Sequence, residues 1–234
     1  MSMTSTLPPD ADKAKTARMS TRNSLTQKPV RLVVGAAALI LLVLMFASTK
    51  IVTGSDASGT ASGTFSPQSF AQEKFESEIA PEISDRAEDL AVVSNALKAD
   101  PAGAAEQYGV VTGSSPAVYS VNLTGIAGQM DANGLLPVQV EGVPADIKVL
   151  VQMGPAINGT AIRDATGKVD FAQFKNQIEY QNVGAELNNQ VKKVVLDSVD
   201  KSNLEGKTVS VTGAFQPINP AAYIITPVKF EVTE

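Results

Sequence analysis

An uncharged apolar run at residues 32–47 constrains this chain more than any other feature of its sequence. As a helix it would span about 25 Å, slightly less than the roughly 30 Å hydrocarbon core of a bilayer. Residues 48–52 can lengthen that helix, with Lys50 reaching the interface. We therefore expect a transmembrane signal anchor over residues 29–52, in contact with the membrane through residues 30–52. The alternative is a signal peptide cleaved near residues 46–49.

The charge of the chain is divided at this run. Six basic and two acidic residues precede it, and 13 basic and 22 acidic residues follow it, which gives net charges of +4 and −9. Basic segments stay on the cytoplasmic side of a membrane. We expect a single-pass protein of the cytoplasmic membrane, with a cytoplasmic N-terminus and an extracytoplasmic C-terminal domain. Nucleic-acid binding is not expected, because phosphate contacts need clustered Lys and Arg.

The sequence contains no cysteine, histidine or tryptophan. This excludes disulfides, thiol nucleophiles, histidine general bases and the usual zinc, copper and iron sites. An acidic loop at residues 197–205 lacks the spacing of an EF-hand. Glycine-rich nucleotide-binding motifs and the G-x-S-x-G nucleophile motif are also missing. We expect a protein that is not an enzyme and that uses no cofactor and no metal.

Composition separates the N-terminal part of the chain into four regions. Residues 1–28 lack apolar periodicity and are expected to be a disordered cytoplasmic tail. After the anchor, residues 53–65 are rich in Gly, Ser, Thr and Ala, as in a flexible linker. A small helical cap is expected over residues 66–108. Its first helix begins at Ser66-Pro67 and should end at Pro81, its second should run from Ser84 or Asp85 to Lys98, and a short third piece covers residues 102–108.

The periodicity changes in residues 109–234. Alternating patterns predict strands, and apolar spacing of three to four residues predicts one long helix starting at Asp170 and ending near Leu196. The strands are expected over residues 118–130, 135–140, 147–153, 207–215 and 223–232, with a short additional piece over 156–162. Pro227 indicates an edge position or a bulge. This order predicts an α+β fold with an OB-like five-stranded β-barrel and one long inserted helix.

Several separated motifs resemble the family of predicted periplasmic lipoproteins of unknown function. The motifs cover roughly residues 50–234 and include Gln152–Asp164, Asn176–Tyr180, Gly213–Phe215 and Thr226–Val228. The resemblance implies an exported, membrane-tethered domain without an established activity, often encoded beside sugar-type ABC transporters. Members usually carry a lipid-modified Cys where this chain has Thr49. The hydrophobic helix is therefore expected to replace the lipid.

Polar residues after the third predicted strand form the densest motif. Asn158, Thr160, Arg163 and Asp164 can converge on a polar ligand, with Gly159 allowing close approach. The alternative is a structural role in which Arg163 pairs with a carboxylate such as Glu179. On the long helix, Glu179 and Tyr180 are either an acid–base pair, which would extend the ligand site, or part of a polar helix face.

These observations leave three functional hypotheses. The first is a non-enzymatic accessory or ligand-binding module of the cell envelope, whose possible partners are components of a solute transporter. The second is a structural scaffold that binds only protein. The third is a hydrolase that uses Glu179 or Asp164 with Tyr180, which the absence of His and Cys disfavours.

Overall fold

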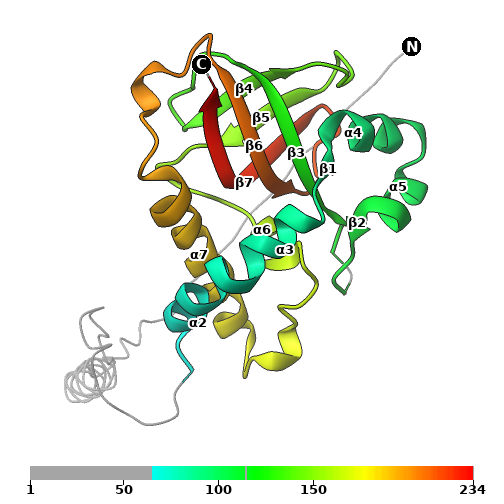
Figure 1. The fold of residues 1–234 in the computed structure, drawn as a ribbon. Coiled ribbons are helices and arrows are strands. Elements are labelled where there is room, and N and C mark those ends of the chain that lie inside the picture. Colours follow the sequence, from blue (N-terminus) through cyan, green and yellow to red (C-terminus); the bar gives the residue numbers. More distant parts are fainter. Residues whose placement is uncertain (1–64, 114, 234) are drawn as a thin grey trace, which may run out of the picture. The chain divides into compact units, whose positions relative to one another are not determined.

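The computed structural model describes residues 65–113 and 115–233 of this chain. Five strands close into a barrel, with helices packed against its outside (Figure 1). The predicted tail, signal anchor and linker lie outside the described residues, apart from Phe65 at the end of the linker. No helix within the described ranges is long and apolar enough to cross a bilayer.

The barrel contains the five strands that the alternating patterns predicted. Its order is β3-β4-β5-β7-β6, and β6 pairs back with β3 to close it. The β5–β7 pair is parallel and the other four pairs are antiparallel. The predicted OB-like barrel is confirmed, and its strands are β3 (Val118–Ala127), β4 (Leu135–Val140), β5 (Lys148–Gln152), β6 (Thr208–Phe215) and β7 (Ala222–Thr233).

The barrel interior holds the apolar half of each alternating strand. On β3, Tyr119 lies opposite Phe215 of β6, and the Phe215 ring packs 4.6 Å from that of Tyr223. Alternation leaves the other face of a strand polar, but Val118 and Ser120 on that face of β3 are also buried. Helices α3 (Ala80–Asp85) and α4 (Leu90–Ala99) pack against β3, so both faces of its first half are covered.

Strand β7 contains the bulge that Pro227 indicated. The β6–β7 register shifts after Thr212, and Gly213 pairs with Pro227. A Cβ atom at Gly213 would overlap the carbonyl oxygen of Thr226, so the close approach of the two strands requires glycine here.

The first helix continues through Pro81, and the prediction that it ends there is wrong. Residues Phe75–Ile79 form a π-helical turn, η1, in which the Ala80 amide donates to the carbonyl oxygen of Phe75. Pro81 then occupies the first turn of a new α-helical segment, where its missing N–H is not needed. The continuous element comprises α2 (Pro67–Lys74), η1 and α3 (Ala80–Asp85).

The second helix starts later than predicted. Asp89 caps it, accepting a 2.7 Å hydrogen bond from the Ala91 amide. The two residues before it, β1 (Glu88–Asp89), are drawn into parallel pairing with β3. The second helix ends at Ala99, before Pro101. Asp100 then caps the third helix, whose first residue is Pro101. These elements are α4 (Leu90–Ala99), α5 (Pro101–Tyr108) and a short strand, β2 (Gly109–Val110), which also pairs with β3.

Two predictions between β5 and β6 are wrong. Residues 156–160 form an irregular loop rather than a strand, and one helical turn, α6 (Ala161–Asp164), follows. The long helix begins at Gln177 rather than at Asp170, because Asn176 caps it and Asp170 caps only a 3₁₀ turn. The elements are η2 (Phe171–Gln173), α7 (Gln177–Gln190), its π-helical continuation η3 (Val191–Leu196) and η4 (Lys201–Asn203).

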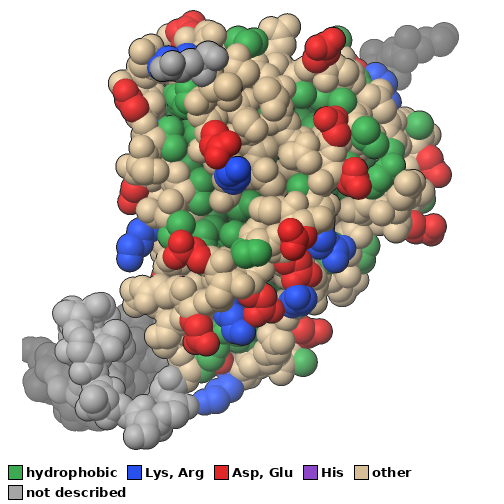
Figure 2. All heavy atoms as spheres, in the orientation of Figure 1, with side chains coloured by type: hydrophobic (Ala, Val, Ile, Leu, Met, Phe, Trp, Pro, Cys, Tyr) green, Lys and Arg blue, Asp and Glu red, His purple; other side chains and the backbone are tan. Residues whose placement is uncertain are grey.

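Helix α7 lies beneath the barrel in Figure 1, with α2 packed against it. Phe174, just before α7, lies 5.2 Å from the ring of Phe65 and 5.8 Å from that of Phe70. On the face shown in Figure 2, acidic side chains are spread out and basic ones lie among them, without a continuous basic surface. The expectation that the chain does not bind nucleic acid stays a prediction.

Candidate ligand-binding site

The loop at residues 155–160, named here the clamp loop, is held by a glutamine from the barrel. Buried Gln152, the last residue of β5, accepts a 2.8 Å hydrogen bond from the Asn158 amide and donates a 2.9 Å bond to the Asn158 carbonyl oxygen. Its Nε2 also donates to Thr226 Oγ1 at 2.7 Å. The Gln152 amide thus pairs with both main-chain groups of Asn158, as a neighbouring strand would. This fixes a loop backbone that forms no β-sheet hydrogen bonds.

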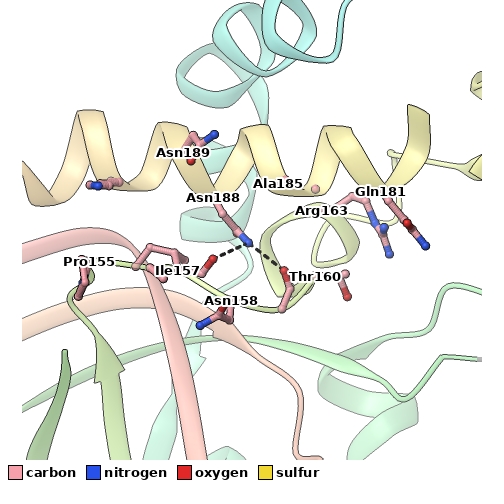
Figure 3. Close-up of a pocket in the computed structure, with 13 residues that line it drawn as sticks. Pro155, Ile157, Asn158, Thr160, Arg163, Gln181, Ala185, Asn188 and Asn189 are labelled. Atoms are coloured by element: carbon pink, nitrogen blue, oxygen red, sulfur yellow. Dashed lines mark hydrogen bonds between the residues drawn. The ribbon is translucent and has the colours of Figure 1, made fainter. Parts of the chain in front are cut away.

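An asparagine from α7 holds the opposite side of the clamp loop. Buried Asn188 donates through Nδ2 to the carbonyl oxygens of Gly159 at 2.9 Å and Ile157 at 3.4 Å (Figure 3). Within the clamp loop, both Gln152 and Asn188 bind main-chain atoms only. The side chains of Asn158 and Thr160 therefore remain available for other contacts.

A cleft of about 620 Å³ lies between the clamp loop and α7; we name it the loop–helix cleft. Asn158, Thr160 and Arg163 line it, so the structure brings three of the six predicted site residues together. Helix α7 and its continuation η3 contribute three amide side chains and one cation to the lining: Gln181, Asn188, Asn189 and Lys192. The described residues that line the cleft include no carboxylate.

Arg163 belongs to a buried cluster behind the cleft. Its Nε and Nη2 donate to the two carboxylate oxygens of Asp164 at 2.7 and 3.0 Å, and its Cζ lies 3.7 Å from the Tyr180 ring centroid. The Tyr180 hydroxyl donates to Asp164 Oδ1 at 3.3 Å. Burial, and then the Asp164 charge, raise the pKa of Tyr180. The cluster fixes the direction of the guanidinium, whose Nη1 has no hydrogen-bond partner among the described residues.

Glu179 lies apart from this cluster. Its carboxylate accepts a 2.9 Å hydrogen bond from the Lys175 amide, and its own amide donates to Asn176 Oδ1 at 2.9 Å. The two bonds stabilise the start of α7 in a variant of the capping box, in which the carboxylate accepts from the residue before the N-cap. The predicted Arg163–Glu179 pair is therefore wrong, because Arg163 pairs with the adjacent Asp164.

The lining and clamping residues that the predicted site left out lie mainly on α7 and β5. Gln181, Asn188 and Lys192 are spaced by seven and four residues, which places them on one helix face. That spacing was visible in the sequence. Gln152 carried no such signal, since a polar residue at a strand end reads as a solvent-facing position.

One family model, described as predicted periplasmic lipoprotein (DUF2291), matches residues 39–231. The chain belongs to this family. The predicted family is thereby confirmed, and its function is unknown. Membership makes this DUF2291 protein extracytoplasmic and membrane-associated. Because the sequence contains no cysteine, the lipid-bearing residue that gives such proteins their name is missing here.

A solved structure agrees with the barrel of this DUF2291 protein. An OB-fold protein from Thermotoga maritima superposes with a TM-score of 0.55 at 22% sequence identity, over 73% of this chain and 99% of that one. At this identity the likeness shows the fold alone. Among curated proteins, none matches this chain.

Proposed function

We propose that this chain is a non-enzymatic ligand-binding module held at the outer face of the cytoplasmic membrane. Its anchor is the helix over residues 29–52, which replaces the missing lipid, and its N-terminus lies in the cytoplasm. Family membership supports the compartment. The charge division around the apolar run supports the orientation.

The observation that carries the binding role is the double clamp on residues 155–160. The side chains of Gln152 and Asn188 hydrogen-bond to the backbone of this short irregular loop. The wall of the loop–helix cleft therefore has one defined shape. Pre-formed concavities with a few fixed polar groups are typical of ligand sites.

The charges at the cleft define the ligand class. Arg163 and exposed Lys192 supply cationic groups, and the amide of Gln181 adds a neutral one. The Asn189 amide donates to Glu186 Oε2 at 3.2 Å. With no carboxylate among the described lining residues, the cleft suits a small polar molecule that carries a carboxylate or phosphate group. Such a module can serve a neighbouring solute transporter, which is the partner that the family resemblance implies.

The test is a titration of the purified chain with three matched probes: glucose, gluconate and glucose 6-phosphate. We expect saturable binding of at least one anionic probe, weakened about 10- to 150-fold by Lys192→Met, since a charge-assisted hydrogen bond contributes roughly 1.5–3 kcal/mol. Lys193→Met is the control, because Lys193 neighbours Lys192 but does not line the cleft. Equal affinities for both variants would place the ligand elsewhere, and no binding of any probe would count against the proposal.

A second candidate is a scaffold that binds only protein. The self-contained Arg163–Asp164–Tyr180 cluster favours it, because this cluster joins α6 to α7 without any ligand. In a scaffold, Arg163→Ala would lower the free energy of unfolding and leave probe binding absent in both proteins. Recovery of the same partner proteins by the wild type and by Lys192→Met would then support the scaffold.

A further inference from the structure

A second concavity lies on the barrel side of the clamp loop. It has a volume of about 380 Å³ and is named here the barrel-face groove. We propose that it is a separate binding site for an uncharged molecule with one apolar face and several hydroxyl or amide groups. The groove shares Asn158 and Thr160 with the loop–helix cleft but lies on the other side of the clamp loop, and its described lining residues carry no charge.

The floor of the groove is apolar because of strand register. Leu135 pairs with Gln152, and Leu150 pairs with Ile224, so the outward residues of β4, β5 and β7 meet on one face. From this face Leu135, Ala222 and Ile224 line the groove, and Ile218 from the β6–β7 loop forms its lip. Ile218 and Ile224 are 78% and 42% exposed. These side chains offer an apolar surface that a ligand can cover.

The rim of the groove consists of neutral hydrogen-bonding groups. None of the described lining residues is charged. Gln152 and Thr226 are buried and bonded to each other, so the groups that remain for a ligand are four side-chain amides and one hydroxyl: Asn133, Asn158, Gln216, Asn219 and Thr160. A charged ligand would lose its hydration here without gaining an opposite charge. A neutral ligand can instead exchange water for amide donors and acceptors while covering the apolar floor.

The groove is held in shape at both ends. At one end Met153 donates a 2.8 Å hydrogen bond to the carbonyl oxygen of Gly134, which ties the β3–β4 turn to the end of β5. At the other end Asn219 Oδ1 accepts a 2.9 Å bond from the Ala221 amide, which shapes the β6–β7 loop. A pre-formed groove loses little conformational entropy when it binds.

The strands beneath the groove differ in how they are paired. Strand β5 has a paired neighbour on each side, β4 and β7, whereas residues 135–137 of β4 and 222–225 of β7 pair only with β5 among the described strands. The contacts that line the groove itself are side-chain amides and the apolar floor. They match a compact molecule such as a neutral saccharide with its carbon–hydrogen face on the isoleucines.

The experiment follows isoleucine methyl groups by NMR in the full chain embedded in lipid nanodiscs. The probe is N,N′-diacetylchitobiose, a neutral molecule with apolar methyls, amides and hydroxyls, and N-acetylmuramic acid is its anionic counterpart. We expect saturable shifts of the Ile218 and Ile224 methyls with the neutral probe below about ten millimolar. The anionic probe should leave these two methyls unchanged.

Ile224→Lys should abolish the shift of the Ile218 methyl, because it replaces part of the apolar floor with a charged side chain and so removes the apolar contact with the probe. Ile126→Lys is the matched control, since Ile126 is 46% exposed on the same barrel but does not line the groove. Lys192→Met should change nothing, which separates this site from the loop–helix cleft. Absence of saturable shifts with the neutral probe, or shifts that survive Ile224→Lys, would overturn the proposal.

Discussion

The guanidinium of Arg163 lies over the ring of Tyr180, with its Cζ 3.7 Å from the ring centroid, while the adjacent Asp164 neutralises its charge. The Arg163 and Asp164 side chains are only 8% and 2% exposed. The pair therefore joins α6 to α7 inside the protein, and one nitrogen is left for the loop–helix cleft. Arg163 therefore belongs both to the core and to the wall of the loop–helix cleft. This is why the sequence around Arg163 supported both a structural and a ligand-binding interpretation.

Asp164→Asn should destabilise the fold by about 3–5 kcal/mol, because it leaves the Arg163 charge buried without its counter-charge. Tyr180→Phe is the control. It keeps the ring under the guanidinium and removes only a 3.3 Å hydrogen bond, so about 0.5–1.5 kcal/mol is expected. Urea unfolding followed by circular dichroism measures both. Equal effects would show that the ion pair contributes little.

Gln152→Met should loosen the clamp loop more than it destabilises the barrel. The replacement keeps the volume but removes the partners of Asn158 and Thr226, with an expected loss of about 1–3 kcal/mol. Hydrogen exchange at the Asn158 amide should accelerate strongly. Gln139→Met is the control, because Gln139 is an exposed residue on β4. Unchanged exchange at Asn158 would mean that Asn188 alone holds the loop.

Gly134→Ala should be far more destabilising than Gly206→Ala, although the two glycines have φ angles of 77° and 78°. Both substitutions incur the left-handed strain of roughly 1–2 kcal/mol. A Cβ at Gly206 meets nothing within 4 Å, whereas a Cβ at Gly134 would overlap the carbonyl oxygen of Gly154. Melting temperatures of the two variants give the comparison. Similar melting temperatures would contradict the tight contact between the β3–β4 turn and the Gly154 carbonyl.

Asp131 should contribute to stability at neutral pH and not in acid. Hydrogen bonds from the backbone amides of Leu135, Asn133 and Gly134 hold the pKa of its carboxyl below the ordinary value, the Leu135 bond having the largest effect. Since the folded-state pKa is depressed, this stability is present above the unfolded value of about 3.9 and is lost as the pH falls through the folded pKa. Asp131→Ala should therefore be less stable than the wild type at pH 7. The difference should shrink near pH 2 in urea unfolding, and a constant difference would contradict the assignment.

Local patterns predicted the barrel well for a physical reason. Tyr119, Val121 and Leu123 alternate with polar residues, and alternation determines which side of a strand is buried wherever the strand pairs. Pro227 likewise indicated its bulge, because proline cannot donate to a ladder. Helix boundaries were predicted less well. Pro81 was read as a terminus, but a π-helical turn before it let the helix continue.

The candidate site was predictable only in part. Asn158, Thr160 and Arg163 stood close together in a glycine-punctuated segment, and they line one cleft. Glu179 was grouped with them because it is next to Tyr180 in the sequence. Its carboxylate instead accepts a hydrogen bond from the Lys175 amide at the start of α7. Adjacent residues on a helix point about 100° apart, so proximity along the chain did not imply a shared site.

By itself the sequence determined the family, the positions of the strands along the chain and the missing lipid attachment residue. Each of these depends on residue identity or on local periodicity. Only the tertiary structure decided that residues 155–160 are a loop with a concavity on either side, one cationic and one neutral. That outcome depends on Gln152, Asn188 and Thr226 meeting from three elements. Hydrogen bonds between residues as far as 74 positions apart leave no local pattern that a reader of the sequence can recognise.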